Sequence, residues 1–247
     1  VSAEHLLAAH ALATELDVPL LTHLAESMDE IETITAQTGK TSVDYLEHLG
    51  LLDSRLLAAH VVWPTPDEIE LLAARGVGVA HCPQSNMKIA AGVAPVPAML
   101  AAGVALGLGT DGAASNNDLD LWDEIDTVAK LHKVVSGDPT VVSAREALRM
   151  ATIEGARALG MENEIGSLEV GKRADLIVVG NTGFHQTPRY DPYSMLTYST
   201  HASDVETVIV EGRLVVEDGM VLTLDAGAVR RRVKEYQLAL APPPRSP

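Results

Sequence analysis

Polar side chains that can bind a metal stand where short apolar runs of the sequence end. His23 ends "LLTH", His60 ends "LLAAH" and His81 ends "VGVAH". Asp111 follows "VALGLGT", and Glu26, three residues after His23, places a carboxylate beside that imidazole. Imidazole nitrogens and carboxylate oxygens are the usual ligands of catalytic zinc. These residues predict a metal site if the fold brings the ends of the runs together.

Each apolar run follows a segment with helical spacing of its apolar residues. "SAEHLLAAHALATELD" precedes "VPLLTH", "SVDYLEHLGLLD" precedes "RLLAAHVV", "PDEIELLAARG" precedes "VGVAHCP", and "PVPAMLAAG" precedes "VALGLGTD". Consecutive helix and strand units indicate parallel strands with right-handed crossovers, and we expect "VPLLTH" to be fully buried. The alternatives are a doubly wound sheet and part of a (β/α)8 barrel. We favour the barrel because it collects strand ends around one mouth and because no GxGxxG motif is present.

Each candidate also has a purely structural interpretation. A histidine at the end of a strand is often a hydrogen-bonded structural residue, and Asp111 before a glycine can cap a helix or form an Asx turn. His185 is a weaker candidate for approaching the site, against the alternative of an exposed loop residue. Cys82 is expected to pack rather than to bind metal. The histidines for which we expect no functional role are His5, His10, His48, His132 and His201.

Composition narrows the class of protein. The 247 residues carry a net charge of -16 and are 47% hydrophobic, and the sequence has one cysteine. The only basic run is Arg230 to Arg232, so binding to nucleic acid or to an anionic membrane is disfavoured. No leader and no apolar run of membrane-spanning length is visible, which predicts a soluble, cytoplasmic protein without an internal disulfide. The start at Val1, without a methionine, suggests that an N-terminal portion has been lost.

Longer motifs carry a resemblance to a known family. "THLAES", "AHCPQSNMKIAAGVAP" and "GTDGAASNNDLDLWDE" are followed by "ALRMATIEGARALG" and "IGSLEVGKRADLIVV". Together these blocks resemble the amidohydrolase superfamily over about residues 1 to 225. They are most similar to its 5'-methylthioadenosine/S-adenosylhomocysteine deaminase branch, with chlorohydrolases and guanine deaminases as cousins.

The resemblance implies a role for each matching residue. His23 and Asp111 match metal ligands, Glu26 matches the acid that handles protons on the purine ring, and His60 matches the histidine near the hydrolytic water. Glu26 and Asp111 would also bind the substrate. The implied reaction is attack of a metal-bound hydroxide on the purine ring carbon of an adenosine-type nucleoside. The metal would be Zn²⁺, or Fe²⁺ or Mn²⁺, and the complete protein is expected to be a homo-oligomer. Further residues expected to line the site are His81, Asn86 and Ser115.

One departure from the family pattern limits these expectations. The family places an H-x-H pair of metal ligands at the end of its first strand, and this sequence contains no such pair. We therefore expect this chain alone to bind zinc weakly and to be inactive. A triazine or guanine hydrolase or a chlorohydrolase is an alternative within the same fold. A non-catalytic fragment, or a binding or interaction domain, is an alternative outside enzymology.

The resemblance and the change in composition after the barrel segment predict three regions. Residues 1–162 would be the C-terminal half of the barrel, about strands 5 to 8 with their helices. Residues 163–225 would be part of a small β domain, with an intervening loop and helix in "FHQTPRYDPYSMLTYSTHAS" and a tight Glu-Gly turn between "VETVIV" and "RLVV". Residues 226–247 would be a last helix and a disordered tail.

Overall fold

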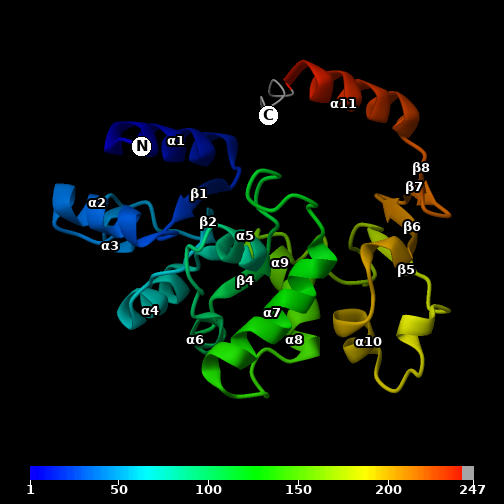
Figure 1. The fold of residues 1–247 in the computed structure, drawn as a ribbon. Coiled ribbons are helices and arrows are strands. Elements are labelled where there is room, and N and C mark those ends of the chain that lie inside the picture. Colours follow the sequence, from blue (N-terminus) through cyan, green and yellow to red (C-terminus); the bar gives the residue numbers. More distant parts are fainter. Residues whose placement is uncertain (241–247) are drawn as a thin grey trace, which may run out of the picture. The chain divides into compact units, whose positions relative to one another are not determined.

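The structure, a computed structural model, describes residues 1–240 and divides the chain into two compact units (Figure 1). The first unit comprises Val1–Lys172 with Thr182–Ala202, and the second comprises Arg173–Asn181 with Ser203–Pro247. The chain therefore leaves the first unit, enters the second, and returns once before ending in the second.

The regions expected from the sequence relate to these units in different ways. The boundary expected after residue 162 lies inside the first unit and stays a prediction. The loop and helix at residues 182–202 also group with the first unit. The tail at residues 241–247, for which we expected disorder, lies outside the described residues.

The elements of the first unit alternate along the chain as the sequence predicted. Its strands are β1 (Leu20–Leu24), β2 (Leu56–His60), β3 (Gly78–His81) and β4 (Ala105–Leu108). Its helices are α1 (Ala3–Leu16), α2 (Met28–Thr38), α3 (Ser42–His48), α4 (Pro66–Arg75), α5 (Pro83–Lys88), α6 (Val96–Ala101), α7 (Leu121–Ser136), α8 (Ala144–Met150), α9 (Ile153–Ala158) and α10 (Pro192–Tyr198). Short 3-10 turns span Phe184–Gln186 and Ala202–Asp204.

The strands of the first unit form a parallel sheet in the order β1-β2-β3-β4. Leu24 of β1 pairs with His60 of β2, and His81 of β3 pairs with Leu108 of β4. The C-terminal ends of the strands therefore reach the same edge of the sheet. This arrangement confirms the α/β class and the parallel pairing expected from the sequence.

Residues in the left-handed conformation end the helices that lead into the strands. Asp17 ends α1 with φ of 53°, and Gly76 ends α4 with φ of 69°. In each case the backbone N–H of the cap donates to carbonyls of the last helical turn. Glycine adopts this conformation without steric cost, which explains the Gly before "VGVAH".

The expectation that "VPLLTH" forms a fully buried strand is wrong. Half-buried and exposed positions alternate along β1 before the buried Leu24, and Leu21 is 59% exposed, whereas every residue of β2 is buried. β1 lies at one edge of the sheet and pairs only with β2 among the described strands. Side chains of a strand at an edge of a sheet have a neighbouring strand on one side, so they stay more accessible to solvent than those of a central strand.

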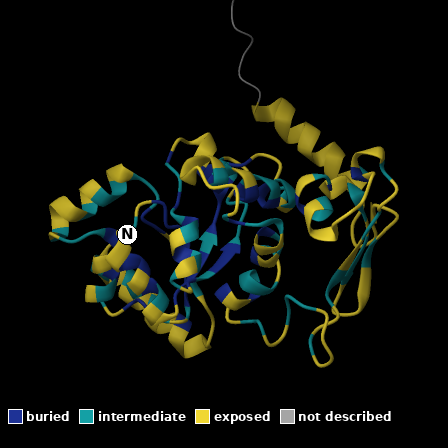
Figure 2. Cartoon of the chain, turned by 90° about the horizontal axis from the view of Figure 1, so that it is seen from below, coloured by how far each residue is buried: buried dark blue, intermediate teal, exposed yellow. Residues whose placement is uncertain are grey.

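The core of the first unit lies between the strands and their helices, where Figure 2 shows the buried residues gathered on the sheet. Helix α9 lies directly against β3 and β4. A Cβ atom added at Gly78 would stand 2.0 Å from the Ala158 carbonyl oxygen, and one at Gly107 would stand 2.8 Å from the Gly155 Cα. Glycines on both elements therefore allow helix and sheet to approach at backbone distance.

The second unit is an antiparallel sheet followed by a helix. Its strands pair in the order β5 (Leu176–Val179), β6 (Val205–Val210), β7 (Arg213–Glu217) and β8 (Met220–Val221). Glu211 and Gly212, with φ of 50° and 73°, form the predicted hairpin turn between β6 and β7. The predicted last helix is α11 (Ala226–Leu240). None of the described helices has both the length and the apolar composition that crossing a membrane requires.

Candidate metal and catalytic site

Three of the predicted residues converge at the C-terminal edge of the parallel sheet. His23, His60 and Asp111 each offer one ligand atom, and these atoms all lie within 4.8 Å of one another. His23 Nε2 lies 3.9 Å from Asp111 Oδ1. The rings of His23 and His60 are stacked, with centroids 5.2 Å apart and planes 16° apart. Two nitrogens and a carboxylate oxygen thus lie close enough together to be shared by one ion.

The backbone turns sharply where these side chains leave the sheet. Ala25 after β1, His60 and Val61 at the end of β2, and Asp111 after β4 all have positive φ, at 52°, 73°, 46° and 60°. A residue other than glycine in this conformation costs about 1–3 kcal/mol, and such residues cluster at functional sites. The left-handed backbone of His60 and Asp111 turns these two side chains out of regular strand geometry, whereas His23 lies within β1 and follows its alternation.

His60 is held by a second buried side chain. Its ring is fully buried, and Nδ1 lies 2.8 Å from Asn86 Oδ1. An amide oxygen only accepts hydrogen bonds, so Nδ1–H donates and Nε2 carries the lone pair. His60 Nε2 is buried and has no hydrogen-bond partner among the described residues. This orphaned acceptor is the feature that a metal ion or a water molecule would satisfy.

Glu26 lies beside His60, with 3.7 Å between Glu26 Oε1 and His60 Nε2. Glu30 holds the turn that carries it: the backbone N–H groups of Ala25 and Glu26 donate to the two Glu30 carboxylate oxygens at 2.9 and 3.0 Å. Ser27 caps α2 by accepting from the Glu30 N–H. Glu30 was not among the residues expected at the site, although the Ser-x-x-Glu spacing from Ser27, which is that of a capping box, was a signal for it.

Asp111 is supported by hydroxyl groups from two segments. Ser85 of α5 donates to Asp111 Oδ2 at 2.8 Å, and Ser115 donates to the same oxygen. Burial alone would raise the pKa of Asp111, but these hydroxyls and the Gly112 N–H together hold it below its usual value. The side chain is therefore a carboxylate at neutral pH. The sequence analysis named Ser115 and missed Ser85, which has no distinguishing signal within "CPQSN".

His81 does not join the three converging residues. Its ring is buried, and Nε2 lies 3.3 Å from Nε2 of His132, a helical residue for which we expected no role. Burial lowers the pKa of both imidazoles, and their mutual proximity lowers that of His81 further. Both rings are thus neutral at pH 7. A role for His81 in lining the site stays a prediction.

Other predicted residues lie in structural settings. Cys82 is buried, and burial raises the pKa of its thiol to about 12, as suits a packing residue. His185 lies in the turn before α10, with its ring centroid 5.2 Å from that of His201. Asp120 caps α7 by accepting a hydrogen bond from the Trp122 N–H.

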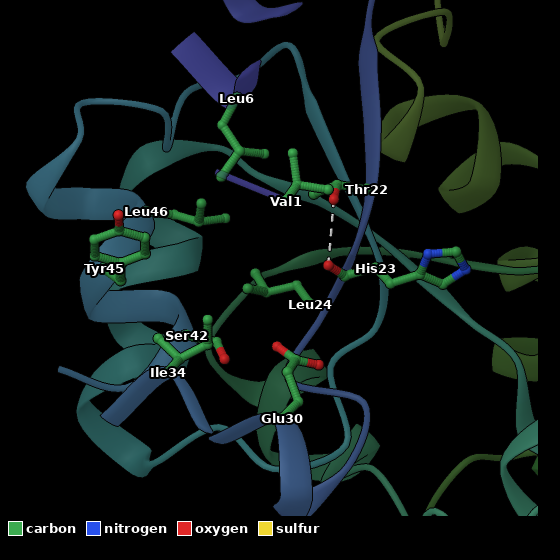
Figure 3. A pocket seen from close by; sticks show the side chains of 10 residues that line it. All are labelled: Val1, Leu6, Thr22, His23, Leu24, Glu30, Ile34, Ser42, Tyr45 and Leu46. Atoms are coloured by element: carbon green, nitrogen blue, oxygen red, sulfur yellow. Dashed lines mark hydrogen bonds between the residues drawn. The ribbon is translucent and has the colours of Figure 1, made fainter. Parts of the chain in front are cut away.

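A pocket of about 250 Å³ lies on the side of β1 opposite to the His23 imidazole (Figure 3). It is lined by apolar side chains such as Leu6, Leu24 and Leu46, together with Glu30. The His23 imidazole points away from it, because consecutive side chains of a strand face opposite sides. His23 is thus shared by the pocket and the cluster of candidate ligands, but its imidazole belongs to the cluster and not to the pocket.

The converging residues fit a divalent metal. Zinc in catalytic sites is bound by imidazole nitrogens and carboxylate oxygens, with a further position for water. His60 Nε2 is both orphaned and in the tautomer that can donate a lone pair. The Asp111 pKa is held low, so this ligand needs no deprotonation before it binds.

Comparisons with known proteins identify the family of this chain. A profile of the amidohydrolase family matches residues 1–215. The chain is 52% identical over 230 residues to the 5-methylthioadenosine/S-adenosylhomocysteine deaminase of Moorella thermoacetica. The aligned residues make up 93% of this chain and 54% of that protein. The chain spans about half the length of the curated relatives it matches.

Solved structures share the fold. The adenosine deaminase of Xanthomonas campestris with bound zinc superposes with a TM-score of 0.94 at 38% identity, over 97% of this chain and 54% of that one. The atrazine chlorohydrolase of Arthrobacter aurescens, complexed with zinc, gives a TM-score of 0.87 at 30% identity, over 98% and 52%. The similarity confirms the predicted fold: the parallel sheet is part of a TIM-like hydrolase barrel.

Proposed function

Because the chain belongs to the amidohydrolase family, we propose that the whole protein is a metal-dependent hydrolase that deaminates an adenosine-type nucleoside. The observation that carries the proposal is the convergence of His23, His60 and Asp111, with the Glu26 carboxylate 3.7 Å from His60. The name of the Moorella relative supports methylthioadenosine and S-adenosylhomocysteine as the substrates.

A divalent metal would be held by His23 and Asp111, with His60 Nε2 beside it. Zinc is the proposed ion, supported by the zinc in the Xanthomonas deaminase structure. When bound, such an ion lowers the pKa of a water molecule from about 15.7 towards about 7 and so supplies a nucleophile at neutral pH. The remaining chemistry belongs to the side chains of this chain.

Two side chains would transfer protons, and a third would hold the attacking water. Deamination replaces the exocyclic amino group of the purine with oxygen from water, and the amino group takes up one of the water protons, which Glu26 would help to deliver, and leaves as ammonia. Glu26, only partly exposed, would donate a proton to a ring nitrogen and make the neighbouring carbon electrophilic. Asp111, a carboxylate at neutral pH, would accept a proton from the attacking water. His60 would hold that water through Nε2, since Asn86 fixes its other nitrogen as the donor.

The test is Asp111→Ala in the whole protein. We expect zinc content and deamination of methylthioadenosine both to be lost, because one ligand and one proton acceptor are removed together. Asp138→Ala is the matched control, since Asp138 is an exposed carboxylate that accepts from Thr140 at 2.8 Å. Unchanged zinc content and turnover in Asp111→Ala would refute the roles proposed for Asp111, and absence of turnover in the wild-type whole protein would favour a non-catalytic binding domain.

A triazine hydrolase or chlorohydrolase is the second candidate, favoured by the similarity to the atrazine chlorohydrolase structure. The higher identity to the Moorella deaminase, 52% against 30%, makes deamination the leading proposal. The candidates separate when methylthioadenosine, S-adenosylhomocysteine, adenosine, guanine and atrazine are assayed side by side for release of ammonia and chloride. Chloride release from atrazine, with no ammonia from any nucleoside, would make chlorohydrolysis the leading proposal.

The expected homo-oligomeric state stays a prediction for the whole protein. Light scattering during size-exclusion chromatography measures it directly, and a monomeric mass would contradict it.

A further inference from the structure

Glu124 of α7 is a buried carboxylate that the proposed chemistry does not use. Its exposed fraction is 0%. Its two oxygens accept hydrogen bonds from two different segments: the Gln84 backbone N–H donates to Oε2 at 3.1 Å, and Asn116 Nδ2 donates to Oε1 at 2.7 Å. A single side chain therefore joins α5 to the loop at residues 112–120.

The bond to Gln84 supplies a helix cap that α5 lacks. Cys82, at the N-cap position, makes no side-chain cap hydrogen bond, and Pro83 has no N–H. The Gln84 N–H is consequently the first donor at this helix end, and unpaired donors there must be satisfied from elsewhere. Glu124 satisfies it from a neighbouring helix, and Gln84 Nε2 adds a bond to Thr127 Oγ1 of α7 at 3.3 Å.

The two joined segments carry the residues that hold the candidate site. On α5, consecutive buried residues reach the two sides of the site: Ser85 donates to Asp111, and Asn86 accepts from His60. In the loop, Ser115 donates to Asp111 and is the immediate neighbour of Asn116. A shift of either segment would move a hydrogen-bond partner of Asp111.

We propose that Glu124 is a positioning residue, which sets the placement of Asp111 and His60 by fixing α5 and the loop at residues 112–120 to α7. The inference rests on the proposed function, because the placement matters to activity only if those two residues serve the metal and its water. Hydrogen-bond partners of ligands typically change metal affinity or activity by about 10–100-fold when removed. Glu124 acts one bond further out, so we expect an effect near the lower end.

The test compares variants of α7 in the whole protein. Glu124→Gln keeps the shape of the side chain but replaces one of its two accepting oxygens with an amide NH2 group, which donates. We expect zinc affinity, measured by competition with a chelator, to fall about tenfold, and kcat to fall by a similar factor with KM little changed. Val128→Ala, at a fully buried position on the same helix, should lower the unfolding midpoint and leave zinc affinity unchanged. Asp126→Asn removes only an ion pair with Lys130 and should change neither.

A second variant tests the proposal if Glu124→Gln does not fold. Asn116→Ala breaks one of the two bonds from a loop position, and we expect a smaller loss of zinc affinity in the same direction. Zinc affinity equal to that of the wild type in whichever of these variants folds would overturn the inference, as would an equal loss in Val128→Ala. If the wild-type protein binds zinc but deaminates no nucleoside, the proposed function is overturned, and the zinc affinities of the variants still decide the role of Glu124. If the wild-type protein binds no zinc, the proposed function and the role of Glu124 are both overturned.

Discussion

Asn86 Oδ1 accepts a hydrogen bond from His60 Nδ1 at 2.8 Å, and both side chains are at least 99% buried. The amide oxygen selects one tautomer of His60 and leaves the lone pair of Nε2 pointing into the cluster of candidate ligands. Asn86 is thus coupled to the site through the histidine.

Removing this acceptor should impair the site more than it impairs the fold. In Asn86→Leu, His60 Nδ1–H would be buried without a partner, which costs about 1–3 kcal/mol and frees the ring to change tautomer. We expect kcat of the whole protein to fall about 10–100-fold. Met87→Ala, at an exposed neighbouring position of α5, is the control. Equal kcat values in the two variants would show that the orientation of His60 does not depend on Asn86.

The buried His132 should make stability depend on pH below neutrality. Burial lowers its pKa from 6.5 to about 4, so the unfolded chain binds a proton in this interval and the folded chain does not. Stability is therefore lost as pH falls from about 6.5 to about 4, by up to about 3 kcal/mol. His132→Gln cannot take up the proton and should flatten this part of the profile. Urea unfolding at a series of pH values measures it, and parallel wild-type and variant curves would contradict it.

Titration of Glu124 should change stability with pH in the direction opposite to that of His132. Burial raises its pKa to about 7 from 4.5, against the lowering effect of the bonds from Gln84 and Asn116, while Asp118 and Asp123 raise it slightly. The folded state then holds the proton more tightly, and stability falls as pH rises from about 4.5 to about 7. Glu124→Gln should remove this decline, so its unfolding free energy relative to the wild type should rise across that interval. A constant difference would argue against titration of Glu124.

The contact between β3 and α9 should tolerate no side chain at Gly78. The Cβ of Gly78→Ala would stand 2.0 Å from the Ala158 carbonyl oxygen, so the helix must move away from the sheet. We expect a loss of about 3 kcal/mol or more in the free energy of unfolding. Gly39→Ala is the comparison: φ is +72° and nothing lies within 4 Å, so only the left-handed conformation costs about 1 kcal/mol. Similar losses in the two variants would refute the close approach.

The strands and their parallel direction could be predicted from the sequence because the signals are local. An apolar run of four to eight residues between helical segments marks a strand wherever it folds, and the polar residue that ends it marks the C-terminal edge. Burial of a whole strand was not predictable in the same way. β1 has as apolar a run as β2, but it lies at the edge of the sheet, and strand order is not a local property.

The sequence by itself determined which polar residues stand at strand ends, and its motifs identified the family. Only the tertiary structure decided which of them meet. His23, His60 and Asp111 converge, while His81, at an equivalent place in its strand, turns to His132. The directions of His60 and Asp111 depend on their left-handed backbone, and two supports of the site, Ser85 and Glu124, bond to residues 26 and 40 positions away along the chain. Partners so far apart leave no spacing in the sequence by which to find them, whereas Glu30, close to Glu26 in the chain, had one.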